Sequence, residues 1–176
     1  YRRQRQMCIR DSLYIGCAGW SLPREHWPAF VTEGTHLQRY ASRFNAVEIN
    51  SSFYRAHLPT TYARWAQSVP STFRFSVKVP KLITHELRLA HCETALEEFL
   101  AQCQRLGDSL GCLLVQLPPS LAYEPVIAAV FFRALRQRYL GAVVLEPREG
   151  QGTSDDQGML GFALRADGSK TDLLYV

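Results

Sequence analysis

The chain of 176 residues is long enough for one globular domain, and a hydrophobic fraction of 47% with a charged fraction of 20% excludes a disordered protein. Its longest apolar runs fall well short of the ~20 residues that a membrane-spanning helix needs, so we expect a soluble protein without membrane contact. Of the net charge of +4, residues 1–12 contribute four arginines against one aspartate, so the overall charge gives no argument for nucleic acid.

The two ends of the chain differ from the rest. Residues 1–12, YRRQRQMCIRDS, show neither helical nor strand periodicity and lack the apolar region of a secretory signal. We expect a disordered or artefactual tail here; a basic arm that binds nucleic acid is the alternative. The final residues, TDLLYV, stop inside a predicted strand. We therefore expect residues 13–176 to form a single TIM-barrel-like domain that is truncated at its C-terminus.

Short apolar runs alternate with longer amphipathic segments. The predicted strands cover residues 13–19, 46–50, 73–79, 112–117, 142–146, 162–167 and 173–176. Apolar residues spaced three and four apart predict helices over 35–44, 92–106 and 124–139. A further helix would be capped by Thr60, Gly107 suits a helix end, and Pro125 suits a first turn.

This alternation predicts an α/β fold with a parallel sheet covered by helices. The first five strands start ~30 residues apart, a typical length for a βα repeat. The segment GCAGW after the first strand lacks the third glycine of a dinucleotide-binding loop. We therefore expect TIM-barrel-like (β/α) repeats with parallel strands that form an incomplete barrel, with the last two strands too close together for a full helix.

The predicted strands carry polar residues where an open sheet would be apolar. In residues 46–50, Val47 and Ile49 point to one face, and Glu48 and Asn50 point to the other. In a doubly wound sheet both faces meet helices, whereas the inner face of a barrel ends in the active site. The pattern therefore favours a barrel.

The same alternation gives a set of inward-facing polar residues at one height: Glu48, Asn50, Lys78, Gln116 and Glu146. Four residues at strand ends would form the rim of the barrel mouth: Trp20, Tyr54, His85 and Arg148. The alternative is that Glu48 and Lys78 form a buried ion pair that only supports the fold. Removing one partner would then cost ~3–5 kcal/mol, because the other charge is left uncompensated.

Several segments also carry a family resemblance. GCAGWS, YASRFNAVEINSSFYR, FRFSVKVPKLITHELRL, LGDSLGCLLVQLPPSL and LEPRE together resemble the YecE-like proteins, a family of unknown function, over residues 13–149. The resemblance implies a TIM-barrel-like fold and no established reaction. The family pattern matches at Gly19, Trp20, Glu48, Asn50, Phe53, Tyr54, Lys78, Thr84, His85, Gln116, Pro118, Pro119, Glu146 and Arg148. It weakens after Arg148, and a later similar stretch puts Asp167 at a strand end.

The first hypothesis for function is an acid/base enzyme that acts on a small polar or phosphorylated metabolite. Two carboxylates in one cavity differ in pKa when one lies near a cation. Lys78 would keep Glu48 ionised as the base, and Glu146 would be the acid. Six residues would bind the substrate: Trp20, Asn50, Tyr54, His85, Gln116 and Arg148. The sequence leaves the cofactor open, and whether the chain is an enzyme at all.

Two other classes of function stay open. A metal-dependent hydrolase or isomerase would use Glu48, Glu146, Asp167 and His85 as ligands, although no two histidines have ligand spacing. A nucleic-acid-binding module would stack bases on Trp20, Trp27, Phe53, Tyr54 and Tyr62, and would meet phosphates with Arg55, Arg64 and Lys81. Core and rim packing is the alternative role for those aromatic residues.

The five cysteines form neither a CxxC motif nor a zinc spacing, and an odd number does not suggest a disulfide framework. We expect free thiols in a reducing compartment and therefore a cytoplasmic protein. Cys17 and Cys112 fall in predicted strands, where we expect them to be small core residues.

Overall fold

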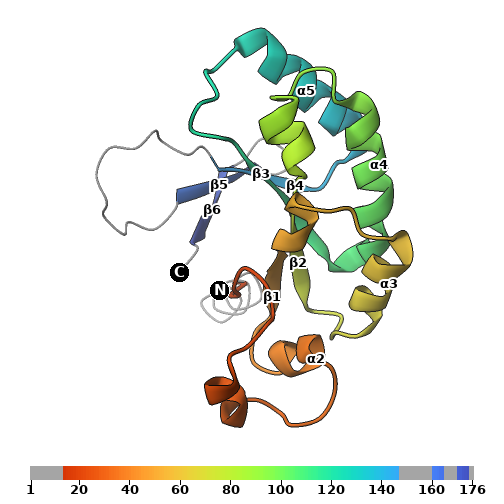
Figure 1. The fold of residues 1–176 in the computed structure, drawn as a ribbon, viewed down its shortest axis with the longest axis vertical. Helices are drawn as coiled ribbons and strands as arrows, with labels where there is room; N and C mark the ends of the chain where they lie inside the picture. The colour runs from red at the N-terminus through yellow and green to blue at the C-terminus, as the bar shows by residue number, and fades with distance from the viewer. Residues whose placement is uncertain (1–13, 147–159, 165–169, 175–176) are drawn as a thin grey trace, which may run out of the picture.

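The computed structural model describes residues 14–146, 160–164 and 170–174, the last two ranges as strands only (Figure 1). The predictions for residues 1–12, Arg148 and Asp167 lie outside these residues. The longer helices are α2 (His36–Ala41), α3 (Pro59–Gln67), α4 (Glu93–Cys103) and α5 (Pro125–Arg138). Short helical turns are η1 (Arg24–Ala29), η2 (Asn50–Phe53), η3 (Leu82–Glu86) and η4 (Gln104–Ser109). The strands are β1 (Ala46–Ile49), β2 (Arg74–Lys78), β3 (Leu110–Gln116), β4 (Ala142–Glu146), β5 (Leu160–Leu164) and β6 (Lys170–Leu174).

The strands form one sheet in the order β1-β2-β3-β4-β5-β6. Neighbours from β1 to β4 are parallel, and β4, β5 and β6 pair in antiparallel fashion. The predicted parallel α/β sheet is confirmed for β1 to β4, whose bounds agree with the predicted ones to within two residues. Among the described residues no strand pairing closes the sheet into a barrel.

The predicted first strand is wrong in extent. Of the described residues 14–19, only Ala18 forms a bridge, with Glu48 of β1 and in parallel orientation. Glu48 N donates to the carbonyl of Cys17 and Gly19 N donates to that of Glu48, both at 3.0 Å. Gly19 then adopts a φ of +98°, which ends the extended backbone after one bridge.

The prediction of parallel strands is also wrong for the last two. They lie at 160–164 and 170–174 rather than 162–167 and 173–176, and they pair antiparallel. A parallel connection needs a crossover of about a dozen residues or more, and the five residues between β5 and β6 are too few.

The helices begin as their sequences dictate, with one exception. Thr35 caps α2 in a capping box with Gln38, and Pro125 is in the first turn of α5 as predicted. The predicted cap at Thr60 is wrong, because α3 starts at Pro59 and Leu58, two residues before Thr60, takes the cap position without a side-chain bond. Gly107 does not end α4 directly; its φ of +56° interrupts η4 instead.

The core lies between one face of the sheet and helices α3, α4 and α5, which line one side of the sheet (Figure 1). The strand residues in this core are Val47, Ile49, Phe75, Val77, Leu113, Val115 and Val143. A separate small cluster on the other face holds Cys112, Leu114 and Val144. The alternation of faces predicted from sequence is therefore present, and α3, α4 and α5 lie against the apolar side.

The two cysteines in predicted strands differ. Cys112 is buried, as expected, and burial raises the pKa of its thiol. Cys17 is exposed, contrary to the prediction, and the segment around it joins the sheet by the single bridge of Ala18.

Phe75 is fully buried at the centre of the helix-facing core. We expect Phe75→Ala to lower the free energy of unfolding by about 3–5 kcal/mol, through lost burial and the cavity left behind. Val126→Ala, at an exposed position of α5, should change it by less than about 0.5 kcal/mol. Urea unfolding of both variants measures the difference, and equal midpoints would contradict the assigned core.

Candidate functional site

Four charged or amide side chains are buried on the sheet face that the helices do not cover. Glu48 on β1, Lys78 on β2, Gln116 on β3 and Glu146 on β4 are each less than 10% exposed. Beneath them on the same face lie Cys112, Leu114 and Val144. We call these four polar residues, together with Asn50, the inner-face cluster.

The sequence suggested that the polar residues lie at one height in the sheet, but the pairing register shows a stagger. Glu48 is in register with Ser76, and Lys78 is in register with Leu114. Gln116 is in register with Glu146. The polar positions therefore step toward the carboxyl ends of the strands from β1 to β3. Strands in a barrel are tilted against the barrel axis, so positions that are staggered in the register can lie at one level along that axis.

Lys78 is the centre of one half of the cluster. Its Nζ donates to Oδ1 of Asn50 at 3.1 Å and lies 4.0 Å from Oε1 of Glu48. It also lies 4.9 Å from the centre of the Phe53 ring, on its face. The ammonium group thus has a carboxylate, an amide oxygen and an aromatic face around it, and each of these attracts a cation.

The turn η2 holds Asn50 beside Lys78. Oγ of Ser52 lies 2.7 Å from the carbonyl oxygen of Ile49 and 2.6 Å from that of Lys78, so it joins the ends of β1 and β2. Ser52 is buried, and we did not predict a role for it. A serine in the segment NSSFY gives no signal by itself, because its partner carbonyl is 26 residues away.

The other half of the cluster is the pair of Gln116 and Glu146. Nε2 of Gln116 donates to Oε1 of Glu146 at 2.6 Å, and both side chains are buried. The two residues are direct partners on neighbouring parallel strands. The amide therefore fixes the orientation of the Glu146 carboxyl group. The charge of this group is close enough to Glu48 to raise the pKa of Glu48.

The electrostatics of Glu48 differ from the expectation. Burial raises the pKa of Glu48, and the charge of Glu146 raises it further, while Lys78 lowers it. We expected Lys78 to keep Glu48 ionised; at 4.0 Å, Lys78 lowers the pKa of Glu48 by less than burial raises it. A carboxyl group whose pKa moves toward neutrality is suited to accept and return a proton.

Two of the predicted rim residues meet at Phe53. The ring of Tyr54 and the ring of His85 each approach Phe53 edge-on, with ring centroids 5.0 Å apart. Tyr54 is 69% exposed, and Nδ1 of His85 lies 2.8 Å from Oγ1 of Thr84. Phe53 thereby lies between Lys78 and the rim residues. The acid/base hypothesis from the sequence assigned no role to Phe53.

The third predicted rim residue that lies within the described part of the chain, Trp20, packs elsewhere. Its ring is edge-on to Trp65 of α3 at 5.1 Å, and it lies against the hydrophobic core. Tyr62 is buried in that core as well. For both residues, packing against the core accounts for the position of the aromatic side chain.

The described residues give no support to a metal centre or a membrane segment. Within them, no group of three or more histidine, cysteine, aspartate or glutamate side chains is arranged to hold a metal ion. In the same part of the chain, no helix has the length and apolar character to span a bilayer.

The fold and the cluster define an α/β protein whose parallel strands carry buried acidic, basic and amide groups on the face away from the helices. The profile of the family described as "Protein of unknown function DUF72" matches residues 14–165. The chain therefore belongs to the DUF72 family.

Individual relatives agree with this assignment. The protein YecE of Escherichia coli is 36% identical over 107 residues, which cover 60% of this chain and 38% of YecE. The protein YunF of Bacillus subtilis is 33% identical over 113 residues, or 61% of this chain and 40% of YunF. The crystal structure of a DUF72 family protein from Enterococcus faecalis superposes with a TM-score of 0.61 at 24% identity, over 77% of this chain and 50% of that one. The chain thus spans about two fifths of these curated relatives.

A shorter similarity is to a different class of protein. A stretch of 36 residues is 81% identical to β-ketoacyl-[acyl-carrier-protein] synthase III of Caulobacter vibrioides, and it covers 20% of this chain and 11% of that enzyme. So small a share of the enzyme shows a common segment and gives no argument for its activity.

The raised pKa of Glu48 makes stability depend on pH. Between the ordinary value of about 4.5 and the raised one, the folded chain binds a proton that the unfolded chain has lost, so stability falls as pH rises. Glu48→Gln removes this contribution. We therefore expect the unfolding free energy of Glu48→Gln, relative to the original chain, to rise with pH above about 4.5.

Urea unfolding from pH 4 to pH 8 measures this dependence, with Glu97→Gln on the exposed side of α4 as the control. The control should give a curve parallel to that of the original chain. A parallel curve for Glu48→Gln would contradict the raised pKa.

Proposed function

We propose that this chain carries the acid/base groups of an enzyme that acts on a small polar or phosphorylated metabolite. The observation that carries the proposal is the burial of two carboxyl groups and one ammonium group on a single sheet face, within mutual electrostatic reach. Buried charges cost folding free energy unless they are paired, and such groups cluster where a protein performs chemistry.

Each group has a role in this proposal. Glu48 exchanges a proton with the substrate, since burial and Glu146 move its pKa toward neutrality. Lys78 binds an anionic or oxygen-bearing part of the substrate, and Asn50 positions the ammonium group. Glu146, oriented by Gln116, serves as the second acid or base.

Substrate binding is proposed for the remaining residues. Tyr54 and His85 adjoin the cluster through Phe53, and Trp20 and Arg148 complete the proposed rim. For Trp20 this requires that one side of a ring packed on Trp65 remains available. The partner that we propose is a small molecule, with nucleic acid as the less supported alternative. The compartment that we propose is the cytoplasm.

The proposal includes a TIM-barrel-like fold, in which the carboxyl ends of parallel strands open into the active site. The staggered register of the inner-face cluster and the restriction of helices to one face support it. Since the chain spans part of its relatives' length, the complete barrel and its activity are proposed for the whole family member.

A metal-dependent hydrolase or isomerase is the alternative chemistry for the same face. Its ligands would be Glu48, Glu146, Asp167 and His85. Lys78 Nζ lies 4.0 Å from Oε1 of Glu48, and its charge disfavours a second cation there. We therefore prefer proton transfer without a metal ion.

Incorporation of solvent deuterium into sugar phosphates tests the proposal. Ribose 5-phosphate, fructose 6-phosphate and glucose 6-phosphate are incubated in deuterium oxide with the protein and followed by proton NMR. We expect exchange with at least one of them, and a loss of about 100-fold or more in Glu48→Gln and Glu146→Gln, the usual contribution of a general acid or base.

Glu97→Gln, an exposed carboxylate on α4, is the matched control and should exchange at the original rate. Circular dichroism establishes that each variant is folded. Exchange that is equally fast in Glu48→Gln would contradict the proposed role of the inner-face cluster.

A further inference from the structure

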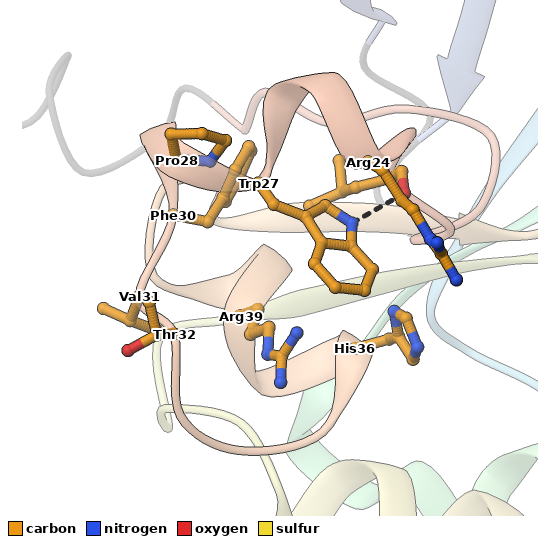
Figure 2. Close-up of a pocket in the computed structure, with 9 residues that line it drawn as sticks. Arg24, Trp27, Pro28, Phe30, Val31, Thr32, His36 and Arg39 are labelled. Atoms are coloured by element: carbon orange, nitrogen blue, oxygen red, sulfur yellow. Dashed lines mark hydrogen bonds between the residues drawn. The ribbon is translucent and has the colours of Figure 1, made fainter.

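A cavity lies away from the inner-face cluster, between η1, the loop that follows it and α2 (Figure 2). Its volume is about 520 Å³, within the range of small-molecule sites. Apolar surface comes from Trp27, Phe30 and Val31, and basic side chains come from Arg24, His36 and Arg39. The cavity shares no residue with the inner-face cluster, so the two can be altered separately.

Trp27 is held in a fixed orientation in this cavity. Its Nε1 donates to the carbonyl oxygen of Leu22 at 3.0 Å, and the ring of His36 approaches it edge-on with centroids 5.9 Å apart. The side chain is still 37% exposed. A large aromatic face that is both oriented and accessible is a contact surface for a flat apolar group.

Arg39 lies against the same ring and has an unused donor. Its guanidinium carbon is 5.2 Å from the centre of Trp27, and Figure 2 shows the guanidinium group facing the space that Trp27 and His36 also border. Its Nε is shielded from solvent and makes no hydrogen bond. An anion in the cavity would therefore meet the outer nitrogens of the guanidinium group, which face this space, rather than the shielded Nε.

The charged side chains that line the cavity, Arg24 and Arg39, are both positive. Two arginines and a histidine line it, and no carboxylate is among its lining residues. Guanidinium groups bind carboxylate, phosphate and sulfonate oxygens through charge-assisted hydrogen bonds. The apolar part of the lining excludes a fully hydrated ion as the best occupant, because such an ion would leave Trp27, Phe30 and Val31 without contact.

We propose that this cavity, the Trp27 cavity, binds a small organic anion that combines a flat apolar group with one negatively charged group. The flat group lies on Trp27, and the charged group accepts hydrogen bonds from Arg39 and Arg24. This site is separate from the proposed catalytic face and does not depend on the proposed function.

A matched pair of fluorescent probes tests the proposal. 8-Anilinonaphthalene-1-sulfonate carries a flat apolar group and one negative charge, and N-phenyl-1-naphthylamine carries the same rings without the charge. We expect the sulfonate to bind at one site, and Arg39→Ala to weaken its binding about tenfold or more, as the loss of a charge-assisted hydrogen bond predicts. The uncharged probe should bind more weakly and should not respond to Arg39→Ala.

Arg64→Ala, at an exposed position on α3, is the control for loss of a positive charge and should leave binding unchanged. Trp27→Leu provides a second variant in case Arg39→Ala does not fold, and it should weaken the binding of both probes. The proposal is overturned if the sulfonate binds Arg39→Ala as tightly as it binds Arg64→Ala. It is equally overturned if the two probes bind the original chain with the same affinity, or if Trp27→Leu retains full affinity.

Discussion

The burial of the Lys78 ammonium group between Glu48 and Asn50 is the constraint on which the rest of the structure depends. A buried charge costs several kcal/mol unless it is paired, so the sheet must hold these partners in place. It does so through Ser52, which joins the ends of β1 and β2. The apolar face of the same strands supplies the hydrophobic stabilisation that offsets this cost, through its contact with α3, α4 and α5.

Much of this arrangement could be predicted from sequence, because strand alternation is a local property. Val47 and Ile49 on one side and Glu48 on the other follow from a period of two, and the structure separates them in this way. The parallel order of β1 to β4 follows from the spacing of apolar runs and helical patterns. The helix start at Pro125 is equally local.

Features that depend on distant partners could not be predicted. The stagger of polar positions from β1 to β3 depends on the pairing register, and the role of Ser52 depends on the carbonyl of Lys78. The direction of the Glu48 pKa shift depends on two opposing effects, the increase caused by burial and the decrease caused by an ammonium group 4.0 Å away. The antiparallel pairing of β5 and β6 broke the repeat that the earlier strands had established.

The central claim is that side chains from separate strands share one electrostatic environment on the inner face. Carbon-13 NMR of the Glu48 side-chain carboxyl group, titrated in the original chain and in Glu146→Gln, tests it most directly. Because the charge of Glu146 raises the pKa of Glu48, the account predicts that Glu146→Gln lowers that pKa, whereas Lys78→Met raises it. A Glu48 titration that is the same in all three proteins would contradict it.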